Sequence, residues 1–284
     1  MNFYQFPASA LSEVRINDAL KTYIPEDHRF VEHPKDADII IMRSAISKIP
    51  LYYSIIDRPI VYSFECGDIE TSIANIKKVY RDCDLIFTYN LDLLESLQSD
   101  IDIFYLALGV SDEFYPIEGI EKEYEVFFPS PHNWDGFYSY YQELNKRSKM
   151  TCYAAMNPDS MSSKHRNLLR DNISLEFAWP LKEDEKLNKI YNSSRFTMDY
   201  HPTGIGIGCL EGLMAGAVPI IIDTRATREI YRESAAFFRT IDDFKAIIDS
   251  DVVWSKELAD EVKSRLSWRI VTQNFWDKVI EKYQ

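Results

Sequence analysis

One stretch of the sequence combines a run of glycines with a single carboxylate: HPTGIGIGCLEGLMAGAVPIII, which begins at His201. Gly204, Gly206 and Gly208 alternate with other residues, and Glu211 follows them. Glycines that lead into a helix leave its backbone N–H groups and the positive end of its dipole open to an anion. A carboxylate early in the same helix can accept hydrogen bonds from ligand hydroxyls. The pattern therefore predicts a diphosphate site, although glycines before a helix also serve close packing alone.

The elements that must position this stretch form an alternating series of short apolar runs and amphipathic segments. Such alternation is typical of parallel strands joined by crossover helices. In the first part we predict strands at 2–6, 29–32, 38–42, 60–64, 85–89 and 103–107, and helices at 12–23, 69–81 and 91–97, the last capped by Asn90. After an acidic, loop-like passage we predict strands at 125–128, 150–154, 173–177, 196–199 and 218–222, and helices at 136–147, 164–170, 184–192, 227–234, 241–249, 255–266 and 268–283. The predicted fold class is α/β, with two doubly wound Rossmann-like domains that face a cleft and bind ligands at the carboxyl ends of their strands.

The composition disfavours several classes of protein. The chain has 284 residues, 46% of them hydrophobic and 14% aromatic, which is enough for a large folded core. Its formal net charge of -13 disfavours nucleic acids and anionic membranes as partners unless a local basic surface overrides it. No apolar run approaches the roughly 20 residues of a membrane helix, so no transmembrane segment is expected. The cysteines are scattered without a Cys-x-x-Cys pair and no signal-like segment begins the chain, which predicts a cytoplasmic protein with reduced thiols at Cys66, Cys83, Cys152 and Cys209.

Four segments, in the same order as in the family, resemble the GT-B glycosyltransferases, especially the large retaining group numbered family 4. The resemblance extends to compact members of bacteriophage type. The segments are FYLALGVSDEFYPI, ISLEFAWPLKEDEKLNKIYNSSRFTMDY, GIGIGCLEGLMAGAVPIII and SWRIVTQNFWDKVIEKY. The resemblance covers residues 100–284 well and residues 1–100 only in layout. It implies an acceptor-side Rossmann-like domain at 1–112, a nucleotide-sugar-binding Rossmann-like domain at 113–266, and a final helix at 267–284 that packs back on the first domain.

The resemblance also implies a donor site. Glu211 matches a glutamate that holds the ribose hydroxyls of the nucleotide. The loop that faces the diphosphate and the sugar is matched by Gly206, Ile207 and Gly208, with Thr203 and Gly204 just before it. The loop that borders the nucleobase is matched by Ala178 and Trp179, and Trp179 is equally readable as a core aromatic.

Two departures from the family pattern concern charge. Thr203 stands where the family has a first glutamate that contacts the donor sugar, which leaves the sugar and the stereochemical outcome open. The Arg and Lys that usually neutralise the diphosphate are absent from FFPSPHNWDGF. Arg225 and Arg228, after a predicted strand end, are candidates to replace them. A second candidate group also fits a solvated helix face: Lys164, His165 and Arg166.

Candidates for catalysis lie on both sides of the expected cleft. Glu65 and Asp68 follow a predicted strand end in the first domain, and in an inverting mechanism Glu65 is placed to act as base. An acidic loop or a helix cap explains them equally well. His201 lies next to the donor loop. No metal site is predicted, because three of the four Asp-x-Asp triplets precede strands instead of following them and the histidines lack ligand spacing.

These observations predict a metal-independent hexosyl- or pentosyltransferase that moves a sugar from a UDP-sugar to an acceptor hydroxyl with retention, and needs no other cofactor. The acceptor stays open between a glycan or lipid-linked glycan and a hydroxymethylated pyrimidine base in DNA. A non-catalytic nucleotide- or glycan-binding module on a degenerate GT-B fold is the alternative of another class, suggested by Thr203 and the missing Arg and Lys. The sequence does not predict the oligomeric state.

Overall fold

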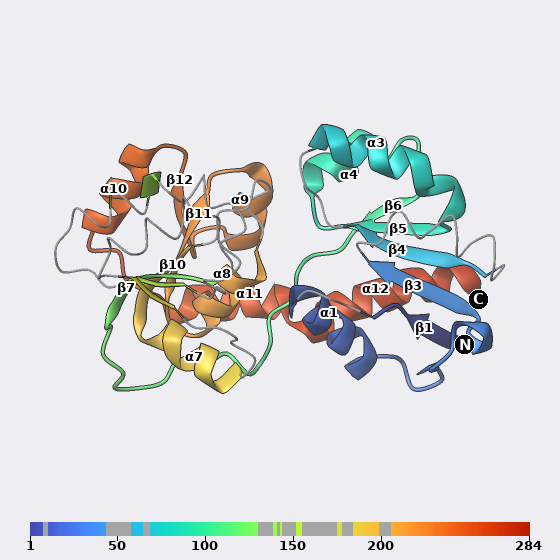
Figure 1. Cartoon of the computed structure of the whole chain (residues 1–284), viewed down its shortest axis with the longest axis horizontal. Coiled ribbons are helices and arrows are strands. Elements are labelled where there is room, and N and C mark those ends of the chain that lie inside the picture. The colour runs from blue at the N-terminus through green and yellow to red at the C-terminus, as the bar shows by residue number, and fades with distance from the viewer. Residues whose placement is uncertain are drawn as a thin grey trace. The chain divides into compact units, whose positions relative to one another are not determined.

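The computed structural model describes residues 1–7, 11–43, 58–64, 69–129, 139–140, 143, 152–154, 175–177, 184–198 and 206–284. The chain divides into two compact units (Figure 1). The first unit is formed by Met1–Gly109 together with Leu266–Gln284, and the second by Val110–Arg265. The divisions thus fall after residues 109 and 265, close to the sequence-based boundaries after residues 112 and 266.

The first unit contains a six-stranded parallel sheet in the order β2-β1-β3-β4-β5-β6. Its strands are β1 (Asn2–Gln5), β2 (Arg29–Phe30), β3 (Ile39–Arg43), β4 (Ile60–Phe64), β5 (Leu85–Thr88) and β6 (Ile103–Tyr105). The strand order reverses direction between β1 and β3, so the sheet is doubly wound.

Helices cover both faces of this sheet because its strands are apolar at successive positions. Its helices are α1 (Leu11–Thr22), α3 (Ile69–Val79), α4 (Leu91–Leu97) and α12 (Trp268–Tyr283), with short turns η1 (Pro34–Asp36) and η3 (Tyr80–Asp82). Successive side chains of a strand point to opposite faces. Accordingly Ile86 packs in one core with residues of α3 and α4, which lie side by side in Figure 1, and Phe87 contacts Phe275 of α12 with ring centroids 4.7 Å apart. Asn90 caps α4 as predicted, since its side chain accepts a 3.0 Å hydrogen bond from the Leu93 N–H.

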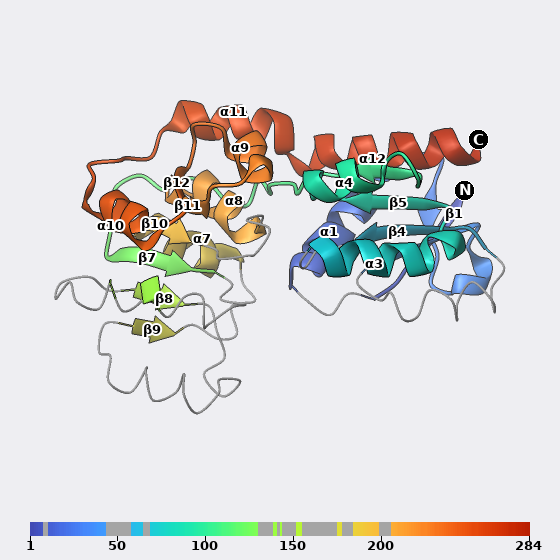
Figure 2. The same cartoon turned by 90° about the horizontal axis from the view of Figure 1, so that it is seen from above.

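The second unit contains another six-stranded parallel sheet, in the order β12-β11-β10-β7-β8-β9. Its strands are β7 (Tyr124–Phe128), β8 (Cys152–Ala154), β9 (Leu175–Phe177), β10 (Ser194–Met198), β11 (Val218–Ile222) and β12 (Ala236–Phe238). Figure 2 shows β7, β8 and β9 running side by side. The chain builds outward from β7 through β8 to β9, then returns to place β10 on the other side of β7. The order therefore reverses between β7 and β10, which is the Rossmann arrangement.

The helices of the second unit are α7 (Asp184–Asn192), α8 (Ile207–Met214), α9 (Arg225–Tyr231), α10 (Ile241–Asp249) and α11 (Lys256–Leu266), whose last residue belongs to the first unit. One face of the sheet packs Val126, Phe196 and Ile220 against Phe244 of α10. The other face carries α7 and α8, with the ring of Phe127 5.0 Å from that of Tyr191.

Most predicted elements that fall on described residues are present: several have the predicted bounds, and the others have one or both ends shifted by one to three residues. Helix α9 begins at Arg225 and not at residue 227, because Thr224 forms a capping box with Thr227. Strand β12 was not predicted. The predicted helix 164–170 lies outside the described residues, and only residues 139, 140 and 143 of the predicted helix 136–147 lie within them. Within the described parts of the chain, every helix is too short or too polar to span a membrane.

Candidate functional site

The point where the second sheet reverses its order is the first place to look for a ligand. In doubly wound sheets, ligands bind beyond the carboxyl ends of the two strands that flank this point. Here those strands are β7, which is followed by Pro129, and β10, after which α8 begins at Ile207. Gly206 is the N-cap of α8, in extended conformation (φ -126°, ψ 138°), and as a glycine it has no side chain of its own to cap the helix. The helix therefore presents its first N–H groups at the ligand-binding edge of the sheet.

Two glycines of α8 are required by its neighbours. A Cβ atom on Gly208 would lie 2.5 Å from the Pro129 side chain, and one on Gly212 would lie 2.4 Å from Cγ2 of Thr197. Both distances are shorter than any normal contact, so a larger residue forces the helix away from β7 and β10. Close packing thus explains Gly208 without any ligand, which is the alternative that the sequence left open. The role of Gly206, Ile207 and Gly208 toward a diphosphate stays a prediction.

Glu211 is a carboxylate inside the protein, in the second turn of α8. Glu211 is only 3% exposed to solvent, and its Oε2 accepts a 3.2 Å hydrogen bond from the hydroxyl of Tyr191. Tyr191 is itself fully buried on α7, between the rings of Phe114 and Phe127. A carboxylate is expensive to bury unless hydrogen bonds compensate it. Its retention next to the reversal point therefore marks Glu211 as a functional candidate.

Tyr191 is not among the site residues predicted from the sequence. The helical period of the predicted helix 184–192 places Tyr191 on the same face as Leu187, and both are buried. That signal identifies an inward-facing aromatic residue but not its partner, which lies 20 positions further along the chain.

Basic residues gather at the carboxyl ends of β11 and β12. Arg225 is the first residue of α9 and is exposed. Arg228 makes a two-point contact with Asp223, at 2.8 and 3.1 Å, and its guanidinium lies 3.9 Å from the ring centroid of Phe237. Arg239 reaches the same carboxylate at 3.1 Å. The hydrogen bond from Arg228, helped by the charge of Arg239, lowers the pKa of Asp223 below its ordinary value. Arg228 is thus held by Asp223, and the role of Arg225 stays a prediction.

One hydrogen bond joins this basic group to the start of α8. Tyr231, the last residue of α9, is fully buried, and its hydroxyl donates to the carbonyl of Gly206 at 3.4 Å. Helix α9 therefore lies beside the N-cap of α8, and the exposed Arg225 belongs to a helix attached to the candidate site.

The remaining predicted site residues lie outside the described residues and stay predictions. They are Glu65, Asp68, Lys164, His165, Arg166, Ala178, Trp179, His201, Thr203 and Gly204. Among the side chains that the structure does describe, no group of three or more His, Cys, Asp or Glu is arranged to hold a metal ion.

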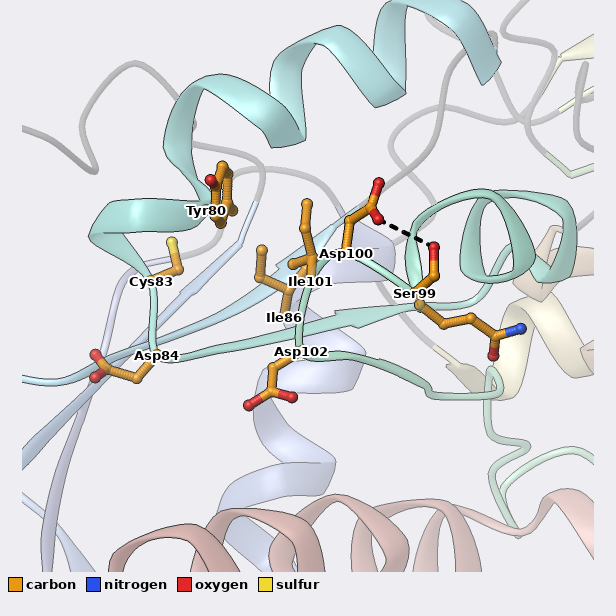
Figure 3. Close-up of a pocket in the computed structure, with 9 residues that line it drawn as sticks. Tyr80, Cys83, Asp84, Ile86, Ser99, Asp100, Ile101 and Asp102 are labelled. Atoms are coloured by element: carbon orange, nitrogen blue, oxygen red, sulfur yellow. Dashed lines mark hydrogen bonds between the residues drawn. The ribbon is translucent and has the colours of Figure 1, made fainter.

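A pocket of about 430 Å³ lies elsewhere, in the first unit (Figure 3). Asp84 precedes β5 and Asp102 precedes β6, so the pocket is at the amino ends of these strands and not at the edge where doubly wound sheets bind ligands. Asp102 pairs with Lys282 at 3.0 Å, and Asp84 accepts a 2.9 Å hydrogen bond from the Ile60 N–H. Burial, with the charges of Asp82 and Asp84, raises the pKa of the Cys83 thiol to about 12. The pocket contains no activated nucleophile among these residues.

Comparison with known proteins gives matches of structure only. No family model and no curated sequence matches this chain. An alpha-glucosyltransferase solved with UDP and a 13-mer DNA containing an HMU base matches with a TM-score of 0.64 and 11% identity, over 99% of each chain. MnaA of S. aureus, solved with UDP, matches with a TM-score of 0.64 and 10% identity, over 98% of this chain and 95% of that one. The GtfA/B complex matches with a TM-score of 0.59 and 11% identity, over 95% of this chain but only 60% of that one.

At 10–12% sequence identity, these structural matches show that the proteins share a fold. It extends over both units, because the matches cover nearly the whole chain. The two parallel, doubly wound sheets agree with it independently. The predicted fold class is therefore confirmed: the chain has the two-domain α/β fold of the GT-B glycosyltransferases.

Proposed function

We propose that this protein is a glycosyltransferase that moves a sugar from a UDP-sugar to an acceptor hydroxyl. The observation that carries the proposal is the start of α8, which has a glycine at its N-cap, lies at the reversal point of the second sheet, and places the buried Glu211 in its second turn. Two structures of the same fold were solved with UDP, which supports a uridine nucleotide as the ligand.

The chemistry would be electrostatic. Departure of a nucleoside diphosphate develops negative charge, and fixed N–H dipoles at a helix start stabilise such charge without reorganising. In this proposal the N–H groups of Ile207 and Gly208 face the diphosphate, Arg225 adds a positive charge, and Glu211 accepts hydrogen bonds from the ribose hydroxyls. A metal ion is not part of the proposal, and activity in EDTA should equal activity in Mg²⁺.

Further residues predicted from the sequence complete the proposal. Ala178 and Trp179 would border the base, and Thr203 and Gly204 would face the sugar. Glu65, Asp68 and His201 are the proposed catalytic groups. Retention follows from the sequence resemblance, and the anomeric proton signal of the first product formed distinguishes it from inversion, in which Glu65 would act as the base.

A modified DNA base is the acceptor that one specific observation favours. The alpha-glucosyltransferase solved with HMU-containing DNA matches this chain over 99% of both lengths, so the likeness of fold extends over the whole of both chains. The net charge of -13 opposes DNA binding. Transfer of labelled glucose from UDP-glucose to duplex DNA with hydroxymethylated pyrimidines, with the unmodified duplex as control, tests this acceptor. Labelling of lipid-linked glycans but not DNA would assign the other acceptor.

Nucleotide binding is the test of the donor site. Unfolding temperature should be measured with UDP, GDP, ADP and UDP-sugars for the wild type, for Glu211→Ala, and for Glu229→Ala as a matched control, since Glu229 is an exposed carboxylate on α9. A ligand at 100 times its Kd stabilises the folded state by about 2.7 kcal/mol. We expect UDP to stabilise the wild type and Glu229→Ala but not Glu211→Ala. Absence of any shift with every nucleotide would refute the proposal, and binding without transfer or hydrolysis would indicate a non-catalytic module.

A further inference from the structure

We propose that Tyr191 is a positioning residue that fixes the Glu211 carboxylate toward a ribose, so that the site selects ribonucleoside over deoxyribonucleoside diphosphates. The inference rests on the proposed function and adds to it the residue that aligns the nucleoside anchor. It is carried by the contacts of Tyr191 in the second unit.

Helix α8 has a slot that fits the Tyr191 side chain. Gly208 and Gly212 lie one turn apart, on the same face of the helix. A Cβ on Gly208 would lie 3.2 Å from the Tyr191 hydroxyl oxygen, and one on Gly212 would lie 3.1 Å from its ring carbon Cδ1. Side chains at these two positions would therefore displace the ring and the hydroxyl. The glycines thus allow α7 to bring a phenol up to Glu211.

The ring cannot turn away from this slot. The rings of Phe114 and Phe127 meet it edge to face, with centroids 5.7 and 5.0 Å from its own. Tyr191 is fully buried, and a buried tyrosine hydroxyl requires a hydrogen-bond partner. Oε2 of Glu211 takes that role at 3.2 Å.

A hydrogen bond from this hydroxyl determines the orientation of the carboxylate. The last torsion of a glutamate side chain is broad and two-fold, so an isolated carboxylate samples many planes. A donor held rigidly at Oε2 selects one plane of the carboxylate. Accepting hydrogen bonds from two adjacent ribose hydroxyls requires such a fixed plane. Tyr191 would therefore act on the nucleotide through Glu211, without touching it.

The test compares two ligands on the same set of proteins. Calorimetric Kd values for UDP and 2′-deoxy-UDP should be measured for the wild type, Tyr191→Phe, Glu211→Gln and the double variant. Tyr140→Phe is the matched control, because Tyr140 is a buried tyrosine of the same unit that packs against Phe238 and Phe244 in the core of the sheet's other face.

We expect the wild type and Tyr140→Phe to bind UDP more tightly than 2′-deoxy-UDP. Tyr191→Phe should weaken UDP binding about tenfold, the effect of losing one hydrogen bond to a charged group, and should reduce the preference for UDP. Glu211→Gln should reduce the preference as well, and Tyr191→Phe should not reduce it further in the Gln background. The ratio of the two Kd values is internal to each protein, so it remains informative for a destabilised variant below its Tm.

Each contrary result has a distinct meaning. An unchanged preference in Tyr191→Phe, with UDP binding still dependent on Glu211, would overturn the role of Tyr191 and leave the proposed function in place. Equal losses from Tyr191→Phe in both backgrounds would show that Tyr191 only supports the fold. Failure of the wild type to bind UDP at all would overturn the proposed function and this inference with it.

Discussion

Gly208 and Gly212 show how the absence of a single carbon atom sets the position of a helix. Each lies against a neighbour that a Cβ would overlap, Pro129 at 2.5 Å and Thr197 at 2.4 Å. The glycines are therefore needed whether or not an anion binds at the helix start. The functional signal in this stretch comes instead from Glu211, because packing alone gives no reason to bury a carboxylate.

Gly212→Ala should lower the stability of the second unit by about 1–3 kcal/mol, since overpacking outweighs the better helix propensity of alanine. Urea unfolding measures the loss. Thr197→Ser removes the Cγ2 atom that the new Cβ would overlap, so adding it should recover part of the loss. A strictly additive double variant would contradict the assigned clash.

The Cys83 thiol should react slowly, because its pKa is raised to about 12 by burial and by two neighbouring aspartates. At pH 8 the thiolate fraction should be roughly a thousandfold below that of an ordinary thiol. Iodoacetamide labelling, followed by mass spectrometry of the Cys83 peptide, measures the rate, and the urea-unfolded protein is the control. Equal rates in the folded and unfolded protein would contradict the prediction.

At the scale of elements, α9 begins where β11 ends and is fixed at both of its own ends. Thr224 caps its start with a reciprocal pair of hydrogen bonds, and Tyr231 at its last turn donates to the carbonyl of Gly206. Asp223 holds Arg228 of α9 and Arg239 after β12. These contacts align the ends of β11 and β12 beside the start of α8.

Asp223→Asn should destabilise the second unit near neutral pH and have little effect in acid. The pKa of Asp223 is lowered in the folded state from a reference of 3.8, so its ionised form stabilises the fold above that pH. Stability from this group is lost as the pH falls through the lowered value. The difference in urea midpoint between wild type and variant should be constant from pH 7 to pH 5 and shrink below about pH 4. A difference that persists at pH 2 would contradict this origin.

The alternation of apolar and amphipathic segments predicts most of the helices and strands found in the described residues. It does not predict strand β12. Strands such as Val218–Ile222 are continuous apolar runs, as expected when both faces of a parallel strand are buried. Strand β12 at the sheet edge is apolar as well, but with only three residues its run is too short to indicate a strand without the pairing with β11. In the same way, the sequence indicated Glu211 from its place in the motif, whereas the Tyr191 contact depends on how α7 and α8 pack.

At the scale of the whole molecule, the chain passes from one unit to the other twice, after Gly109 and after Arg265. Gly109 lies against the Trp268 ring, where a Cβ would come within 2.2 Å of the ring carbon Cε3. Trp268 begins α12 and is buried. The two segments at which the chain leaves and re-enters the first unit therefore pack against each other within that unit.

Gly109→Ala should displace the Trp268 ring and lower the stability of the first unit by about 1–3 kcal/mol. Thermal unfolding measures the loss, and Gly119→Ala is a control for strain without a clash, because its φ is +79° but no atom lies within 4 Å of its Cβ position. An unchanged unfolding transition in Gly109→Ala would show that Trp268 can move freely.

The first unit combines a segment that is synthesised first, Met1–Gly109, with one that is synthesised last, Leu266–Gln284. Phe3 of β1 packs on Trp276 of α12 with ring centroids 4.9 Å apart, so the part of the first sheet that α12 covers stays exposed until residues 268–283 have been made. The second unit is continuous and precedes α12 in the chain. Because domains fold as units during translation, the second unit can fold on the ribosome before α12, which completes the first unit, has been synthesised.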